Sequence, residues 1–209
     1  MSLVLHDYEL DADAYKVRLL LALLGVPHEK VPVNVHPGRE HLSPAYRRLN
    51  LLGTLPILVD GDLVLHGAEA ILAYLARRFD TERRWLPEEP SAFGRVLMWL
   101  GFAGHELAPA TAARLHHMLE APGDPVALDH AARSAFRILE DEMTRRELAG
   151  QKWFVGDRAT LADIALFPAI ALSRDFGIDH DEYPALRRWM RRVRALPGFV
   201  TMPGIPDYH

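Results

Sequence analysis

The sequence contains no cysteine and no long run of apolar or of basic residues. Without cysteine, disulfides, zinc–thiolate sites, CxxC redox chemistry and catalysis by a protein thiolate are excluded. No apolar stretch approaches the length of a membrane span, and residues 1–5 are too short and too soon polar for a signal peptide. We therefore expect a cytoplasmic protein with no membrane partner.

Charge and histidine content narrow the classes of partner. The 209 residues carry a net charge of −4, which disfavours a nucleic-acid partner. Two arginine pairs, at 187–188 and 191–192, could form a basic surface, but a solvated helix face is the favoured interpretation. Eleven histidines are present, yet His116 and His117 are adjacent and no His-x-x-x-His pattern occurs, so no metal site is expected.

The segment 50–61 is the most informative stretch of the chain. Pro56 has no backbone donor, so it fits the first position of the strand predicted at 57–59. The Leu55–Pro56 bond is a candidate for a cis peptide, and Asp60-Gly61 indicates a hairpin. The backbone before Pro56, including Thr54 and Leu55, would then be free to pair with an extended ligand. The pattern predicts a binding edge for a peptide-like molecule.

The order of elements predicts an α+β fold in two parts. A strand at 3–8, a helix at 15–24 capped by Asp13, a second strand, the hairpin and a helix at 67–79 follow the order of a thioredoxin-like domain. We therefore expect a thioredoxin-like domain at 1–79, a linker at 80–90 and an all-helical domain at 91–209. In the latter, 93–119 is long enough for one bent helix, and Thr160 with Asp163 forms a capping box.

Four segments, in the right order and spacing, together resemble the cytosolic glutathione transferases of the bacterial type. They are Tyr15–Gly25, Asn50–Gly61, Ala70–Leu75 and Phe154–Asp163. The resemblance implies a thioredoxin-like domain packed on a helical domain, usually as a homodimer. It also implies glutathione as cosubstrate, no metal, and a small hydrophobic molecule as second substrate.

The turn before the first helix departs from that family. Relatives usually carry a Ser-Gly-Asn-Cys-like turn, whose serine or cysteine contacts the glutathione sulfur; here the turn is Asp11-Ala12-Asp13-Ala14. An ionised Asp11 is acceptor-only and would repel a thiolate, by about 4 kcal/mol at ~4 Å. Tyr8 is the alternative hydroxyl donor, although a packed strand-end aromatic is the favoured interpretation of that residue.

The start of the third helix departs as well. Relatives usually have Glu-Ser or Gln-Ser at Gly67-Ala68, where the two side chains hold the γ-glutamyl group. The helix N-terminus remains to attract a carboxylate, and Glu69 opposes it. Two lost contacts to charged groups would weaken glutathione binding by roughly 10²–10⁴-fold. The resemblance also implies that His41 lies near the glycyl carboxylate of glutathione. The competing interpretation of His41 is a solvated loop histidine.

The resemblance implies that the start of the long helix lines a cleft between the domains. The candidate residues are Trp99, Phe102, His105, Glu106 and Pro109. Aromatics at helical spacing are more often core than ligand wall, so both roles stay open for Trp99 and Phe102.

Three hypotheses about function remain open at this point. The first is a glutathione-transferase-like enzyme acting on hydrophobic electrophiles. The second is a non-catalytic protein of the same fold that binds another small molecule or a protein. The third is a glutathione-independent enzyme with Asp11 as general base, which requires that burial raise its pKa.

Overall fold

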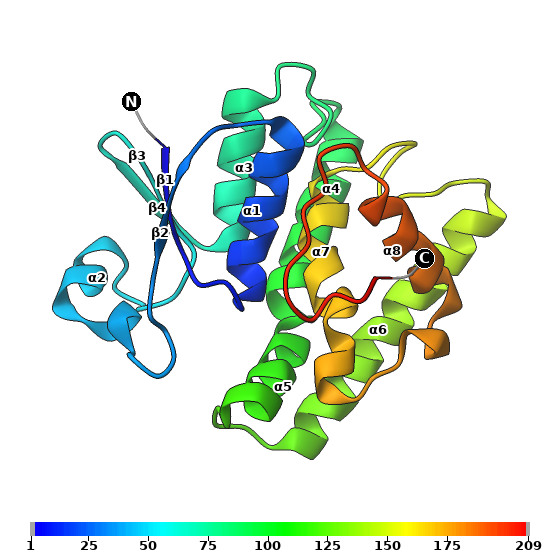
Figure 1. The fold of residues 1–209 in the computed structure, drawn as a ribbon. Coiled ribbons are helices and arrows are strands. Elements are labelled where there is room, and N and C mark those ends of the chain that lie inside the picture. The colour runs from blue at the N-terminus through cyan, green and yellow to red at the C-terminus, as the bar shows by residue number, and fades with distance from the viewer. Residues whose placement is uncertain (1–2, 208–209) are drawn as a thin grey trace.

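A four-stranded sheet forms the first part of the chain in the computed structural model, which describes residues 3–207 (Figure 1). Its strands are β1 (Leu3–Asp7), β2 (Glu29–Pro32), β3 (Ile57–Asp60) and β4 (Leu63–His66). The strand order is β2-β1-β3-β4, with β1 and β2 parallel and the other pairs antiparallel. The parallel pair needs a crossover, which the first helix supplies. The arrangement is thioredoxin-like, as predicted.

Helices cover both faces of this sheet. Helices α1 (Ala12–Leu24) and α3 (Ala68–Phe79) lie on one face, and the short α2 (Pro44–Leu49) lies on the other (Figure 1). Under α2, a small apolar cluster gathers Val33, Leu55 and Ile57. The segment before Pro56 is therefore held by packing on the α2 side of the sheet.

The second part of the chain is helical. Its elements are α4 (Pro90–His105), α5 (Ala108–Leu119), α6 (Pro125–Leu148), α7 (Leu161–Ala171) and α8 (Pro184–Arg194), with short 3₁₀ turns at Glu40–Leu42, Ser173–Phe176 and His180–Glu182. Every residue of α7 is buried. Within residues 3–207 no helix has the length and apolarity that a membrane span requires.

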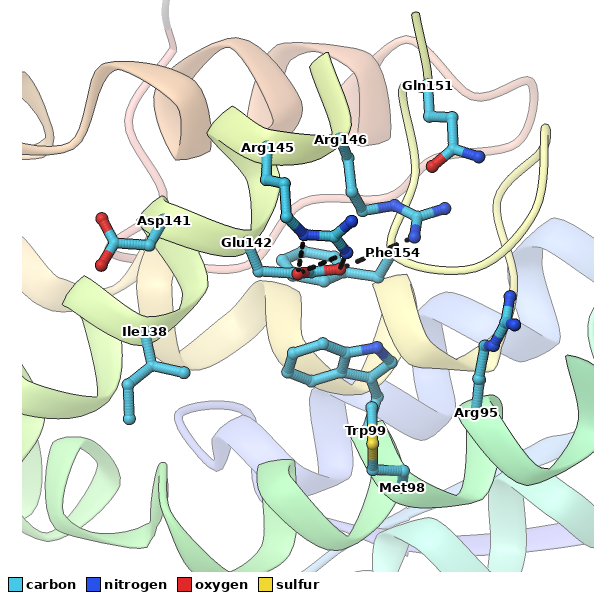
Figure 2. Close-up of a pocket in the computed structure, with 10 residues that line it drawn as sticks. All are labelled: Arg95, Met98, Trp99, Ile138, Asp141, Glu142, Arg145, Arg146, Gln151 and Phe154. Carbon is cyan, nitrogen blue, oxygen red and sulfur yellow. Dashed lines mark hydrogen bonds and ion pairs between the residues drawn. The ribbon is translucent and has the colours of Figure 1, made fainter. Parts of the chain in front are cut away.

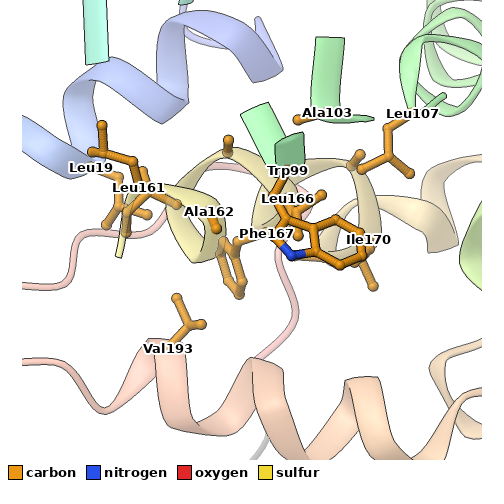
Figure 3. Packing of buried hydrophobic residues seen from close by; sticks show 14 of the residues in the cluster. Leu19, Trp99, Ala103, Leu107, Leu161, Ala162, Leu166, Phe167, Ile170 and Val193 are labelled. Atoms are coloured by element: carbon orange, nitrogen blue, oxygen red, sulfur yellow. The ribbon is translucent and has the colours of Figure 1, made fainter. Parts of the chain in front are cut away.

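One apolar core joins the two parts. Helix α7 contacts α1 and α3 of the first part and α4 and α8 of the second. In the core, Leu19 of α1 lies near Leu161 and Phe167 of α7, with Trp99 of α4 close by (Figure 3). Residues 80–89 connect α3 to α4, so that Pro90, the last residue of the predicted linker, already lies in α4. This is the α+β architecture expected from the sequence.

Two local predictions were wrong. The single helix expected at 93–119 is two helices, because Pro109 has no N–H to donate and opens the first turn of α5. Helix α1 is capped by Asp11 rather than Asp13: the Asp11 Oδ1 atom accepts a hydrogen bond from the Ala14 amide at 2.7 Å. Since the helix already starts at Ala12, Asp13 lies inside its first turn.

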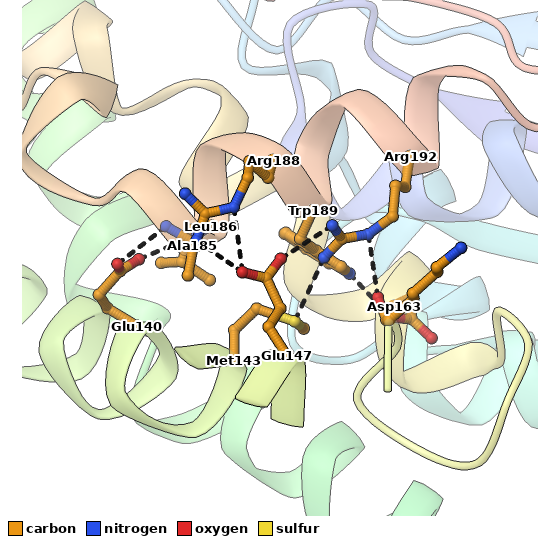
Figure 4. Close-up of polar contacts among 10 residues, drawn as sticks. Glu140, Met143, Glu147, Asp163, Ala185, Leu186, Arg188, Trp189 and Arg192 are labelled. Atoms are coloured by element: carbon orange, nitrogen blue, oxygen red, sulfur yellow. Dashed lines mark hydrogen bonds and ion pairs between the residues drawn. The ribbon is translucent and has the colours of Figure 1, made fainter. Parts of the chain in front are cut away.

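The capping box of α7 is present and entirely buried. Asp163 Oδ2 accepts a hydrogen bond from the Thr160 amide at 2.9 Å. Its Oδ1 atom accepts a hydrogen bond from the Phe154 amide at 3.2 Å. The same atom accepts one from the Trp189 indole at 2.8 Å (Figure 4). The carboxylate thus joins the loop before α7, the start of α7 and α8.

The arginines of α8 are engaged within the helical part of the chain. Arg188 and Arg192 both pair with Glu147 of α6, at 2.6 and 2.8 Å (Figure 4). Arg187 pairs with Asp181 at 2.5 Å. These contacts favour the interpretation of this surface as a helix face over that of a nucleic-acid site.

Candidate functional site

The segment before β3 presents a rigid backbone edge. Asn50 is buried, and its side-chain amide donates to the Thr54 carbonyl and hydroxyl, both at 2.9 Å. The Leu55–Pro56 bond is cis. In the described part of the chain the Leu55 amide has no hydrogen-bond partner. An extended ligand could therefore pair with this edge without displacing an existing contact.

The turn between β1 and α1 carries the two candidate catalytic residues. The Asp11 amide donates to the Tyr8 carbonyl at 2.9 Å, which closes the turn. Burial, reinforced by the nearby negative charge of Asp13, raises the pKa of Asp11 to about 7. Asp11 therefore exists in both protonation states near neutral pH, and its protonated form is a hydrogen-bond donor. The repulsion between an ionised Asp11 and a thiolate, expected from the sequence, therefore does not apply to the protonated form of Asp11.

Tyr8 packs at the end of β1 against the cluster of Val33, Leu55 and Ile57. Its ring is partly buried there, as expected for a strand-end aromatic. Its hydroxyl has no hydrogen-bond partner among residues 3–207. The same side chain thus combines a packed ring with an uncommitted hydroxyl near the Leu55 edge.

The start of α3 is shaped by Gly67. Its φ of +83° lies in the region that favours glycine, although the space around a Cβ would be open. Ala68 follows it and is buried. A glutamate at position 67, as in relatives, would therefore require a different backbone conformation here, and the local departure from the family extends beyond the side chains.

A buried lysine offsets the acidic groups near α3. The Lys16 ammonium lies 3.0 Å from Glu69 Oε1 and 2.6 Å from Asp13 Oδ1. Burial acts to lower the pKa of Lys16, but the two carboxylates outweigh it and raise the pKa. Because Glu69 is paired, it repels an incoming carboxylate less than the sequence suggested.

His41 lies in the 3₁₀ turn that precedes α2. Burial, together with the charge of Arg39, lowers the pKa of its imidazole. The ring is therefore neutral at pH 7. Its Nδ1 atom is buried and has no partner among the described side chains and backbone groups. A neutral His41 could donate a hydrogen bond to a carboxylate but would not supply a positive charge.

The candidate cleft residues are spread over the end of α4 and the start of α5. Trp99 is buried and makes edge contacts with Phe102 and Phe154. Phe102 is half-buried, as is Pro109, whereas His105 and Glu106 are exposed. The site side of α4 is marked by Gly104, where an added Cβ would lie 3.6 Å from the Glu69 carboxyl carbon.

Trp99 also lines a cavity between α4 and α6, with a volume of about 840 Å³ (Figure 2). Its floor contains Trp99 and Phe154, and its rim carries the exposed Met98 and Ile138. On the rim, Glu142 binds Arg145 through both carboxylate oxygens, at 2.7 Å to Nη2. No group of three potential ligands within residues 3–207 is arranged to hold a metal ion.

Three residues of the site were not singled out from the sequence. Lys16 and Arg18 lie in the Tyr15–Gly25 segment, so their proximity to the turn could have been inferred from helical spacing. Arg114 lies 104 residues from its partner Leu10. Nothing in the sequence indicates that contact, because it depends on how the two parts of the chain pack.

Comparison with known proteins places this geometry in a family. Residues 14–78 match the family model for the glutathione S-transferase N-terminal domain, and residues 124–197 match that for the C-terminal domain. Maleylacetoacetate isomerase of Pseudomonas aeruginosa is 30% identical over 202 residues, which cover 93% of this chain and 92% of that protein.

Solved structures agree with this assignment. A glutathione S-transferase from Pseudomonas fluorescens superposes with a TM-score of 0.87 at 27% identity, covering 97% of this chain and all (100%) of that one. A glutathione transferase homolog from Lodderomyces elongisporus, solved with two GSH per subunit, gives a TM-score of 0.84 at 27% identity, covering 95% of each chain. The chain therefore belongs to the glutathione S-transferase family.

Proposed function

We propose that this protein binds glutathione along the Leu55–Pro56 edge and uses its thiol against a hydrophobic electrophile. The observation that carries the proposal is the unpaired Leu55 amide, which follows Thr54, the residue held by Asn50; the Leu55 side chain belongs to the cluster against which Tyr8 packs. A peptide-like ligand paired with this edge would extend toward the turn that contains Asp11. A homolog of the same fold has been solved with GSH.

Asp11 is the proposed base. In its ionised form it accepts the thiol proton, and the resulting neutral carboxyl donates a hydrogen bond to the thiolate. The thiolate then attacks an electrophilic carbon, the C–S bond forms and the leaving group departs with the displaced electron pair. A pKa of about 7 suits a base that works near neutral pH. The Tyr8 hydroxyl is the second candidate donor to the sulfur.

The direct test combines a glutathione titration by calorimetry with a chlorodinitrobenzene conjugation assay. We expect weak, millimolar binding and measurable turnover, with kcat/KM rising through a midpoint near pH 7 as Asp11 ionises. Asp11→Ala should lower kcat/KM by about 10²-fold, because general-base catalysis contributes on this scale, and should abolish the midpoint. Asp124→Asn, an exposed helix cap on α6, serves as the control and should leave the profile unchanged.

The alternative is a non-catalytic member of the family that binds another small molecule or a protein. Gly67 and Ala68 favour it, because neither supplies a side-chain contact to a γ-glutamyl group. No heat of glutathione binding and no conjugation in the parent protein would support this alternative over the enzyme. A cytoplasmic location stays a prediction under either function.

We further propose that the protein is a homodimer through the cavity between α4 and α6. The exposed apolar residues Met98 and Ile138 line the cavity, and Arg95 and Asp141 of opposite charge lie on different sides of it (Figure 2). A two-fold axis brings each patch against its own copy, so that opposite charges on one rim can pair across the axis.

The dimer proposal predicts that Ile138→Asp yields a monomer in sedimentation equilibrium. The substitution would bury an unpaired charge in the contact, which is strongly unfavourable. Val126→Asp lies on the same helix, on a residue that is 76% exposed and outside the cavity, and should remain dimeric. Dimeric Ile138→Asp protein would place the contact elsewhere.

A further inference from the structure

Arginines hold the turn between β1 and α1 by its backbone carbonyls. Arg18 of α1 donates from Nη1 to the Tyr8 carbonyl at 3.3 Å and from Nη2 to the Glu9 carbonyl at 2.9 Å. Arg114 of α5 donates from Nη1 to the Leu10 carbonyl at 2.5 Å. Three consecutive carbonyls before Asp11 thus accept hydrogen bonds from charged donors, which are among the stronger hydrogen bonds in proteins.

Each arginine is itself anchored by a carboxylate. Arg18 pairs with the fully buried Asp7 of β1. The Nε atom of Arg114 lies 2.7 Å from Oδ2 of Asp175, in the 3₁₀ turn after α7. Arg18 therefore ties the turn to its own sheet, whereas Arg114 ties it to the helical part of the chain.

The burial of Arg114 is hard to explain by stability alone. Its side chain is 3% exposed, and its Nη2 atom is buried without a hydrogen-bond partner among residues 3–207. An unpaired donor in the interior is unfavourable, and apolar side chains of similar volume often replace buried ion pairs at no loss of stability. An apolar side chain at this position could not donate a hydrogen bond to the Leu10 carbonyl.

We propose that Arg114 is a positioning residue for the reactive turn: by fixing the Leu10 carbonyl it fixes the next residue, Asp11, from the far side of the domain junction. That this positioning matters for catalysis rests on the proposed function. That the environment of Asp11 depends on Arg114 does not rest on it. The arginine acts through the backbone and does not touch the thiol.

The effect on Asp11 distinguishes positioning from simple charge. The charged groups that act on the Asp11 carboxyl are Asp13 of α1 and Asp7 of β1, while Arg18 and Arg114 hold the backbone just before it. If Arg114 positions the turn, its loss lets more water reach the partly exposed Asp11, and the pKa of the carboxyl falls from about 7 toward its ordinary value. If Arg114 acted only as a cation, its loss would raise that pKa.

The experiment follows the titration of Asp11 by NMR in the full-length protein. The Ala14 amide donates to Asp11 Oδ1 at 2.7 Å, so its proton and nitrogen shifts report the ionisation directly. We expect a midpoint near pH 7 in the parent. In Arg114→Met and in Arg114→Lys it should fall by about one pH unit or more, because lysine keeps the charge but not the two-pronged geometry.

Arg146 supplies the matched control. It is also a buried arginine, it donates to the Trp153 carbonyl and it lies near Glu142, but it does not contact the turn. Arg146→Met should lower stability and leave the Ala14 midpoint unchanged. If Arg114→Met does not fold, the midpoint of Arg114→Lys tests the proposal. If neither variant folds, Asp175→Asn takes their place, because it weakens the ion pair that anchors Arg114 and should lower the Ala14 midpoint.

A folded Arg114→Lys variant with the parent midpoint would overturn the proposal, as would a raised midpoint in Arg114→Met. Activity is measured alongside. If the parent neither binds glutathione nor conjugates chlorodinitrobenzene while the midpoints still fall, the proposed function fails and the positioning role survives. If the parent turns over substrate and the midpoints of the variants do not move, the proposed function survives and the positioning role of Arg114 fails.

Discussion

Replacing Asp163 with alanine is expected to remove about 4 kcal/mol of unfolding free energy, a large share of the roughly 5–15 kcal/mol that stabilises a typical domain. Asp163 is fully buried and accepts hydrogen bonds from the amides of Phe154 and Thr160 and from the Trp189 indole. Alanine leaves all three donors buried and unsatisfied, at about 1–3 kcal/mol each.

The measurement is urea unfolding followed by tryptophan fluorescence, to which Trp189 contributes as one of four tryptophans. Asp179 offers a matched control, because it forms a capping box with Glu182 in which its side chain is 56% exposed. Asp179→Ala should lose less than about 1 kcal/mol, since water can satisfy the freed amides. Equal losses in the two variants would show that burial of the Asp163 network contributes nothing beyond ordinary capping.

An Asp11→Asn variant is expected to be more stable than the parent at pH 8, by roughly 2 kcal/mol. The pKa of Asp11 is raised to about 7 in the folded protein, so between its unfolded pKa and pH 7 the folded state binds more protons than the unfolded state. Parent stability therefore falls as pH rises through this window. Asparagine does not titrate, and it caps a helix as well as aspartate does.

The size of the effect follows from the pKa shift. Each unit corresponds to about 1.4 kcal/mol, which gives roughly 4 kcal/mol as an upper limit for this shift. We expect about half, because Asp11 keeps some contact with water. The advantage of the variant should be absent near pH 4, grow up to about pH 7 and then stay constant.

Thermal and urea unfolding across pH 4–8 test this profile. Asp124→Asn, the exposed cap of α6, should show little pH dependence relative to the parent. An Asp11→Asn variant that is less stable than the parent at pH 8 would mean that the folded protein stabilises the ionised carboxylate. That result would also remove the basis for Asp11 as a base near pH 7.

The turn and the start of α3 depart from the family in different ways. At the turn, the change from serine or cysteine to Asp11 replaces a donor with a group that can act as donor or base, depending on its protonation. At α3, the loss of a glutamate is coupled to the backbone, since Gly67 has a φ of +83°. Restoring Glu at 67 would add about 1–3 kcal/mol of strain, so side-chain substitution alone would not rebuild that contact.

Local patterns in the sequence were sufficient to predict most of the fold. The hairpin signal at Asp60-Gly61 and the capping pair Thr160 and Asp163 each depend on residues close in the chain, so they could be predicted without a structure. The break between α4 and α5 was missed because helical periodicity continues through it, although Pro109 was the available signal. The cap of α1 was misplaced by two residues because both Asp11 and Asp13 are good caps.

By itself, the sequence predicted the order of elements, the cis Leu55–Pro56 bond and the absence of glutamate and serine side chains at Gly67-Ala68. These follow from residue type and spacing along the chain. Only the tertiary structure shows the burial that raises the pKa of Asp11, the pairing of Glu69 with Lys16 and the hydrogen bond from Arg114 to the Leu10 carbonyl. A pKa and a contact across 104 residues depend on burial and on neighbours from distant segments, and neither is encoded in local spacing.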